Sequence, residues 1–296
     1  MSSIGLNGKV VRSEKATISV MDHGFLYGVG LFETFRTYGG VPSLLRRHLD
    51  RMRSACISLG IVYEPDEDQL RHYIQDLLRA NQLEDGYIRY TLTAGIDDLG
   101  LPSGDYLHPQ EIIYIKPLPT MAAHFYEKGK ALRLLQTRRN TPEGSVRLKS
   151  LHYMNNIIAK RELINIMLPG ESPAEGLMLT ESSYIAEGIV SNVFFIHEGI
   201  VHTPTIEAGI LPGITRACVL ELAASQGWKT EQGWYKWEQL LQADEVFITN
   251  SIQEIVPITL LIGTDGTNVT PLAGSACGPI TKELIELYRK KAREQE

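Results

Sequence analysis

Alternating hydrophobic and polar positions mark strands in the first third of the chain. Residues 32–38 alternate with a period of two, the pattern of a half-buried strand. Asn7-Gly8 separates two short apolar runs and predicts a tight hairpin turn between them. Strands of the same kind are expected at residues 87–93 and 111–116.

Two helices are expected between these strands. Residues 46–59 have apolar side chains at helical spacing, and Gly60 stands where a C-terminal cap belongs. Residues 66–80 repeat the helical pattern after Pro65, which is a helix start signal. The first third therefore has the pattern of an α/β domain.

A stretch without clear period separates this region from the rest of the chain. It contains Pro117 and Pro119 and extends to Gly129. We interpret it as a linker, which divides the chain into a small N-terminal α/β domain (residues 1–117), the linker (118–130) and a larger C-terminal α/β domain (131–296).

The C-terminal domain mixes strands and helices with frequent hairpin turns. This mixture favours α+β domains with largely antiparallel pairing over a doubly wound Rossmann sheet. The elements expected are strands at 131–137, within 176–203 and at 245–249, and helices at 153–167, 213–226 and 279–293.

Composition excludes several classes of protein. The 296 residues are 43% hydrophobic and 22% charged, enough for a core in each of two domains. A net charge of −6 without a dense basic run disfavours nucleic acid as a partner. The apolar runs are far shorter than the ~20 residues that cross a bilayer, so no membrane association is expected.

The N-terminal residues and the cysteines predict a cytoplasmic protein. The first residues lack the basic and apolar regions of a signal peptide. Three scattered cysteines fit reduced thiols better than disulfides, and the histidines show no metal-ligand spacing, so no metal is expected.

Three polar features have the types of side chain that chemistry requires. Lys149 lies at the end of a polar loop and just before a helix, where a lysine alone is usually a solvated charge. Glu187 is an acid within an apolar strand region, which is costly unless the acid is paired. Residues 211–216 form a turn into a helix, whose first N–H groups can bind phosphate, although a plain helix start has the same pattern.

Taken together, these segments resemble the class IV aminotransferase signature at the correct spacings. The match includes Glu187, Asn192-Val193-Phe194 and Leu211-Pro212-Gly213-Ile214-Thr215-Arg216, and the resemblance extends over nearly the whole chain. It implies a fold-type IV pyridoxal 5'-phosphate enzyme, with two mixed α/β domains joined by a linker and the active site between them.

The resemblance also implies roles for individual residues. Lys149 matches the lysine that binds the cofactor as a Schiff base and then acts as general base. Glu187 matches the acid that hydrogen-bonds the pyridine nitrogen. The remaining cofactor-binding positions are Arg51, Ile214, Thr215 and Ser251 at the phosphate and Leu211 on one face of the ring.

Thr34 favours one branch of the family. Aminodeoxychorismate lyases have Thr at this position, whereas branched-chain aminotransferases have Gly and D-amino-acid aminotransferases an aliphatic residue. Residues 94–100 lack the arginine and histidine pair that D-amino-acid aminotransferases use. We therefore expect a lyase that converts 4-amino-4-deoxychorismate to 4-aminobenzoate and pyruvate, with Thr34 assisting Lys149. Thr34 is also an ordinary strand residue, and an amino-acid aminotransferase is the alternative.

The substrate carries two carboxylates, so its site needs cations. Arg89 corresponds to a substrate-facing position of the family, and Arg36 and Arg147 are further candidates. The resemblance also implies a homodimer, in which the loop of residues 96–108 edges the partner's site.

Overall fold

The computed structural model describes residues 2–121, 124–167, 174–272 and 276–294. The chain divides into two compact units. The first unit comprises Met1–Thr120, Leu148–His152 and Ala292–Glu296, and the second comprises Met121–Arg147 and Tyr153–Lys291. Lys149 therefore belongs to the first unit, although the chain on either side of its five-residue segment belongs to the second. A division of the chain into continuous ranges would place Lys149 in the second unit.

The first unit contains one antiparallel sheet of six strands, with the order β2-β1-β6-β5-β3-β4. Strand β3 pairs with β5 over seven residue pairs, from Gly30↔Thr93 to Arg36↔Tyr87, and β5 pairs with β6 over seven more. The strands are β1 (Ser3–Leu6), β2 (Lys9–Arg12), β3 (Gly30–Tyr38), β4 (Val41–Pro42), β5 (Tyr87–Thr93) and β6 (Gln110–Lys116). Two short helical segments, η1 (Ser13–Lys15) and α1 (His23–Leu26), lie between β2 and β3.

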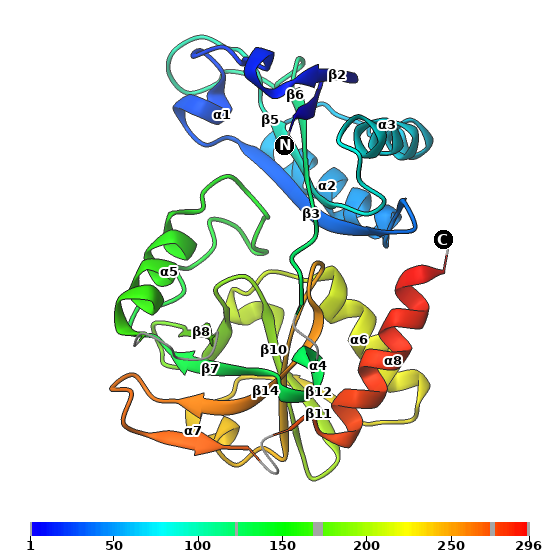
Figure 1. The fold of residues 1–296 in the computed structure, drawn as a ribbon. Coiled ribbons are helices and arrows are strands. Elements are labelled where there is room, and N and C mark those ends of the chain that lie inside the picture. Colours follow the sequence, from blue (N-terminus) through cyan, green and yellow to red (C-terminus); the bar gives the residue numbers. More distant parts are fainter. Residues whose placement is uncertain (1, 122–123, 168–173, 273–275, 295–296) are drawn as a thin grey trace. The chain divides into compact units, whose positions relative to one another are not determined.

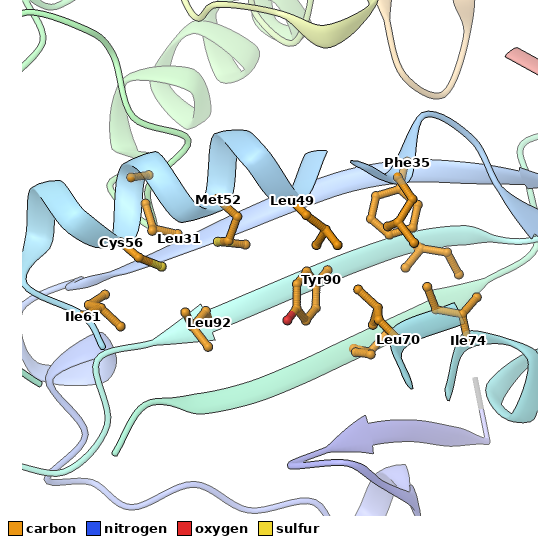
Figure 2. Packing of buried hydrophobic residues seen from close by; sticks show 14 of the residues in the cluster. Leu31, Phe35, Leu49, Met52, Cys56, Ile61, Leu70, Ile74, Tyr90 and Leu92 are labelled. Atoms are coloured by element: carbon orange, nitrogen blue, oxygen red, sulfur yellow. The ribbon is translucent and has the colours of Figure 1, made fainter. Parts of the chain in front are cut away.

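Helices α2 (Leu45–Leu59) and α3 (Glu67–Ala80) pack their apolar stripes on one face of this sheet. Leu49 and Met52 of α2 are buried against Phe35 of β3 and Tyr90 of β5 (Figure 2). Odd-numbered residues of β3, such as Leu31 and Phe35, therefore point toward the helices. Because side chains alternate along a strand, the even-numbered residues point to the other face.

Both helices end and begin where their local sequences predict. Gly60 closes α2 with a φ of 63°, a conformation that glycine adopts without steric cost, and its N–H bonds to Cys56 and Ile57 carbonyls. Asp66 caps α3 by accepting a hydrogen bond from the Gln69 N–H at 2.9 Å.

The second unit contains a nine-stranded mixed sheet, with β15 paired to β14 beside the path β12-β11-β10-β13-β14-β7-β8-β9. The pairs β11–β12, β14–β7 and β7–β8 are parallel, and the other pairs are antiparallel. The strands are β7 (Lys130–Leu134), β8 (Ala174–Leu179), β9 (Ile185–Gly188), β10 (Asn192–His197), β11 (Ile200–Pro204), β12 (Thr230–Gly233), β13 (Glu245–Asn250), β14 (Glu254–Ile262) and β15 (Val269–Pro271). The predicted α+β character and mainly antiparallel pairing are confirmed.

The helices of the second unit surround this sheet (Figure 1). They are α4 (Phe125–Lys128), α5 (Met154–Ile166), α6 (Ile214–Ser225), α7 (Trp237–Leu240) and α8 (Pro279–Arg293), with the short η2 (Ile206–Ala208). Helix α4 falls inside residues 118–130, which the sequence pattern had assigned to an irregular linker. A four-residue helix is too short to show a periodic pattern.

The strand expected at residues 131–137 is shorter in the structure and ends at Leu134. The N–H groups of Gln136 and Thr137 donate to the Glu162 carboxylate of α5, at 2.6 and 2.8 Å. A side chain distant in sequence therefore takes up donors that a longer strand would use in its ladder.

Candidate active site

Lys149 lies on a short extended segment that adds to the free edge of β3. The Phe32 N–H donates to the Lys149 carbonyl at 2.9 Å, and the Leu151 N–H donates to the Gly30 carbonyl at 3.0 Å. An isolated antiparallel bridge between Leu31 and Ser150 lies between these two bonds. The backbone of Lys149 is thus fixed to β3 of the first unit.

This register brings Lys149, Thr34 and Arg89 to the sheet face opposite the helices. Lys149 lies directly across from Phe32, and its Nζ is 4.6 Å from the centre of the Phe32 ring. Thr34 follows Phe32 by two residues and therefore shares its face, as a diagonal neighbour of Lys149. Arg89 is paired with Thr34 across β5, and its guanidinium lies 3.6 Å from the Phe32 ring centre. The expected general base (Lys149), its auxiliary hydroxyl (Thr34) and the expected substrate-binding arginine (Arg89) thus lie on the same face of the sheet as the Phe32 ring.

A shallow hollow extends along this face beside Arg89. It has a volume of about 390 Å³ and is lined by residues that include Arg89, Thr91, Tyr114, Phe25 and Leu151. The Thr91 hydroxyl is buried and has no hydrogen-bond partner among the described residues. A guanidinium and two kinds of hydroxyl beside apolar walls suit a small molecule that carries a carboxylate.

On the helix side of β3, Arg51 is engaged by a buried carboxylate. Its Nε and one Nη donate to the two oxygens of Glu33 at 2.8 and 2.6 Å. His48 Nδ1 contacts Glu33 Oε2 at 2.6 Å, and both Glu33 and His48 are almost fully buried. Glu33 was not recognised from the sequence.

The charges of this cluster oppose the cost of burial. Burial on its own raises the pKa of Glu33, but the adjacent Arg51 charge and the bonds from His48 and Arg51 outweigh it and lower the pKa to about 2. Burial lowers the pKa of His48 despite its bond to Glu33, and the Lys149 charge is among the smaller contributors in the same direction. The Lys149 ammonium therefore lies within electrostatic range of the cluster that holds Arg51.

In the second unit, Glu187 on β9 is buried and surrounded by donors. Arg139 Nε donates to Oε1 at 2.8 Å, and the Leu211 N–H donates to Oε2 at 3.0 Å. The Asn192 side chain adds a longer bond to Oε2 at 3.3 Å, and Arg147 Nε lies 3.8 Å from Oε1. The cost of burying an acid is thus met by specific partners.

Leu211 connects this carboxylate to the start of α6. Asn192 donates to the Leu211 carbonyl at 3.0 Å, and Gly213 is the N-cap residue of the helix. A Cβ at Gly213 would lie 2.0 Å from Asn192 Oδ1, so only glycine permits this close approach. Without a capping side chain, the first N–H groups of α6, at Ile214 and Thr215, are oriented to bind an anion.

Ser251 lies in the turn between β13 and β14, near the same edge of the sheet. The Asn250 side chain shapes this turn by accepting bonds from the Ile252 and Gln253 N–H groups, at 3.0 and 2.7 Å. Because Asn192 pairs with Thr249 across β10 and β13, the turn follows directly after the strand position beside Asn192. A hydroxyl and a helix N-terminus therefore lie on either side of Asn192.

The residues of the second unit fit a phosphorylated pyridine. A carboxylate suits a ring nitrogen, and the N-terminus of α6 suits a phosphate. Leu211 lies between Glu187 and the start of α6 in the chain, and its apolar side chain suits contact with the face of a ring. Because a Cβ at Gly213 would clash with Asn192, the glycine lets this helix start lie close to the Asn192 side chain.

Several hydrogen-bond and ion-pair partners of these residues were not recognised from the sequence. Arg139, which binds Glu187 most closely, was assigned to an unremarkable polar loop. The signal that points to it is the buried acid itself, because such an acid requires a cation or several donors. Arg147, named as a further candidate for a substrate carboxylate, donates to the Gly209 carbonyl at 2.6 Å and to Asn140, and its role stays a prediction.

Comparison with known proteins agrees with this geometry. A model of the amino-transferase class IV family matches residues 30–261. The chain belongs to the class IV aminotransferase family. The recognition of the family and of its fold from the sequence is confirmed.

Three relatives show the range of this family. Aminodeoxychorismate lyase of Bacillus subtilis (strain 168) is 39% identical, over 98% of this chain and 94% of the relative. The crystal structure of 4-amino-4-deoxychorismate lyase from Pseudomonas aeruginosa has a TM-score of 0.82 at 28% identity, covering 98% of this chain and 100% of that one. A branched-chain amino acid aminotransferase of T.th., solved with pyridoxamine 5'-phosphate, has a TM-score of 0.81 at 26% identity, covering 99% and 95%.

Two further properties bear on function. No helix in the described part of the chain is both long and apolar enough to span a bilayer. Within residues 2–121, 124–167, 174–272 and 276–294, histidine, cysteine and carboxylate side chains form no group that could hold a metal ion.

Proposed function

We propose that this protein is a pyridoxal-phosphate-dependent aminodeoxychorismate lyase, which converts 4-amino-4-deoxychorismate to 4-aminobenzoate and pyruvate for folate synthesis. The observation that carries the proposal is the placement of Thr34 on the face of Lys149, directly across from Arg89. The lyase from Bacillus subtilis, 39% identical over nearly the full length, supports it.

Lys149 would hold the aldehyde carbon of the cofactor and Glu187 its ring nitrogen, and Leu211 would pack on the ring. The Ile214 and Thr215 N–H groups, the Ser251 hydroxyl and Arg51 would hold the phosphate. When bound, pyridoxal phosphate withdraws electrons from the substrate carbon that carries the amine.

Lys149 then acts as the base. Its amine takes the proton from that carbon, the adjacent carbon–oxygen bond breaks, and the enolpyruvyl group leaves and becomes pyruvate. Thr34 is within reach of the Lys149 amine as its diagonal neighbour, so its hydroxyl can orient that amine and relay the proton. Arg89 binds a substrate carboxylate, with Tyr114 and Thr91 beside it in the hollow.

An amino-acid aminotransferase is the second candidate, favoured by the match to the branched-chain aminotransferase solved with pyridoxamine 5'-phosphate. The two activities differ in what they consume. The lyase restores its cofactor in each cycle, whereas an aminotransferase stops at the amine form until a keto acid arrives.

A homodimer in the cytoplasm is the assembly and location we propose. The loop of residues 96–108 exposes large apolar side chains, with Ile96 62%, Leu99 71% and Leu101 95% exposed. Such a surface is typical of a protein–protein contact, and a molar mass of two chains by light scattering would agree with it.

The deciding experiment supplies 4-amino-4-deoxychorismate to the purified holoenzyme and follows pyruvate with lactate dehydrogenase, without added keto acid. We expect many turnovers per active site. A single turnover that resumes only when a keto acid is added would establish the aminotransferase instead.

A further inference from the structure

Two guanidinium groups share one oxygen of the Glu187 carboxylate. Arg139 Nε is 2.8 Å and Arg147 Nε 3.8 Å from Oε1, and all three side chains are at most 8% exposed. Two positive charges therefore face one negative charge, in surroundings that screen them weakly.

The wider surroundings do not cancel this excess. Arg216 of α6 also feels the Glu187 charge, while its own guanidinium donates to the Pro204 carbonyl and Gln232. Among the described residues, Glu143 is a second acid whose charge acts on Arg147, and it is exposed. Burial and the adjacent Arg139 charge lower the pKa of Arg147 to about 10, so it still carries its charge at neutral pH.

Arg147 is held in this position by the backbone of both neighbouring segments. Its Nε donates to the Gly209 carbonyl at 2.6 Å, two residues before Leu211, and its other nitrogens donate to Asn140. It also lies two residues before Lys149. A flexible surface arginine would not be oriented by three such bonds.

We propose that Arg147 is a positioning residue that favours elimination over transamination, by adding a second positive charge beside Glu187. The inference rests on the proposed function, in which Glu187 faces the pyridine nitrogen. A carboxylate already shared by two cations stabilises a proton on that nitrogen less well, because the proton would bring a further positive charge.

The charge on the ring nitrogen decides where the electrons go. After Lys149 removes the substrate proton, the electron pair on carbon can break the adjacent carbon–oxygen bond. The oxygen then leaves with that bond's pair and, after protonation, pyruvate forms. Bound pyridoxal phosphate would also supply a competing route, transamination, in which it would accept the pair and end in its amine form. An unprotonated ring accepts electrons less well, so the Arg147 charge suppresses the second route.

The test compares Arg147→Gln with Arg147→Lys and with Arg138→Gln as a matched control in the same loop. The first readout is the pH midpoint of the visible absorbance of the bound cofactor, recorded without substrate. We expect Arg147→Gln to raise it by about one unit, as the loss of a nearby like charge does. Arg147→Lys and Arg138→Gln should stay within about 0.3 unit of wild type, because both keep the charge at position 147.

The second readout is the number of pyruvate molecules released per cofactor converted to the amine form. It should fall at least about tenfold in Arg147→Gln, which corresponds to one pKa unit. An unchanged midpoint in Arg147→Gln overturns the proposal. So does a shift of about one unit in Arg147→Lys, because it would show that hydrogen bonds rather than charge matter. This second outcome overturns the proposal even if Arg147→Gln does not fold.

The two proposals can fail separately. If wild type releases no pyruvate but Arg147→Gln still shifts the midpoint, the lyase function is wrong and the charge effect stands. The second readout is then the rate at which D-alanine or L-alanine converts the bound cofactor to the amine form. This rate should rise about tenfold in Arg147→Gln, again the effect of one pKa unit, and no rise would refute the role in suppressing transamination.

Discussion

Replacing Glu33 by glutamine should weaken the first unit in a pH-dependent way. The Glu33 side chain is 2% exposed and makes hydrogen bonds with Arg51 and His48. Its pKa is lowered from 4.5 to about 2. Glutamine keeps the size of the side chain and removes the charge that these partners bind.

The magnitude follows from the pKa difference between the folded and unfolded chain. A folded pKa below the unfolded value adds stability that is complete above pH 4.5 and disappears as the pH falls through about 2. The difference corresponds to about 3 kcal/mol in the free energy of unfolding, similar to the cost of breaking a buried pair. About 1 kcal/mol of it should be lost by pH 4 and about 2 kcal/mol by pH 3.

The assay must report on the first unit, because all three tryptophans (Trp228, Trp234 and Trp237) lie in the second. Urea unfolding at pH 7, 4 and 3 can be read by a short deuterium pulse at one fixed pH, followed by the masses of peptides from β3 and α2. We expect Glu33→Gln to be about 3 kcal/mol less stable than wild type at pH 7 and about 1 kcal/mol less stable at pH 3. The exposed Glu181→Gln should match wild type at each pH.

His48 lowers the free energy of unfolding at acidic pH in both wild type and Glu33→Gln. Its pKa is lowered by burial, so the unfolded chain binds a proton first as the pH falls below 6.5, and stability decreases there. The comparison of wild type with Glu33→Gln therefore reports the carboxylate together with its effect on His48, whose pKa the Glu33 bond and charge raise. A variant within 1 kcal/mol of wild type at pH 7, or a difference that does not change with pH, would refute the reasoning.

Three further substitutions test the proposed site. Lys149→Ala should abolish both the yellow absorbance and activity, and borohydride reduction that still attaches the cofactor to another lysine would contradict the assignment. Arg51→Ala should weaken cofactor binding by roughly 10- to 150-fold with little change in turnover at saturating cofactor, because a charge-assisted bond contributes about 1.5–3 kcal/mol; unchanged affinity with collapsed turnover would assign Arg51 to the substrate. Thr34→Ala should slow pyruvate release at least about tenfold with cofactor affinity intact, the low end of general acid–base assistance, and Thr34→Ser should restore most of the rate if the hydroxyl is responsible.

The local sequence was sufficient for most elements of the fold. Helical spacing with Gly60 and Asp66 at its ends located α2 and α3, since caps and turns depend on residues close in the chain. The motif that includes Glu187 and the start of α6 identified the family, because its spacing reflects one compact substructure.

The partners of the site residues depended on contacts between distant segments. Arg139 is 48 residues from Glu187, and nothing in its own loop indicates which acid it binds. Glu33 reads as one polar position of an alternating strand, yet it points toward the helices and is buried beneath Arg51 and His48. Such pairings follow from the packing of whole elements, which no short window of sequence contains.

The placement of the segment around Lys149 in the first unit could not be predicted from the local sequence either. The residues themselves predicted a lysine just ahead of a helix, and the motif predicted its chemistry. Only the tertiary structure determined that this segment joins the edge of β3 and that Thr34 and Arg89 share its face. The cause is the backbone hydrogen bonding of that free edge, which any extended segment can satisfy, so the choice of partner is made by the fold and not by the side chains.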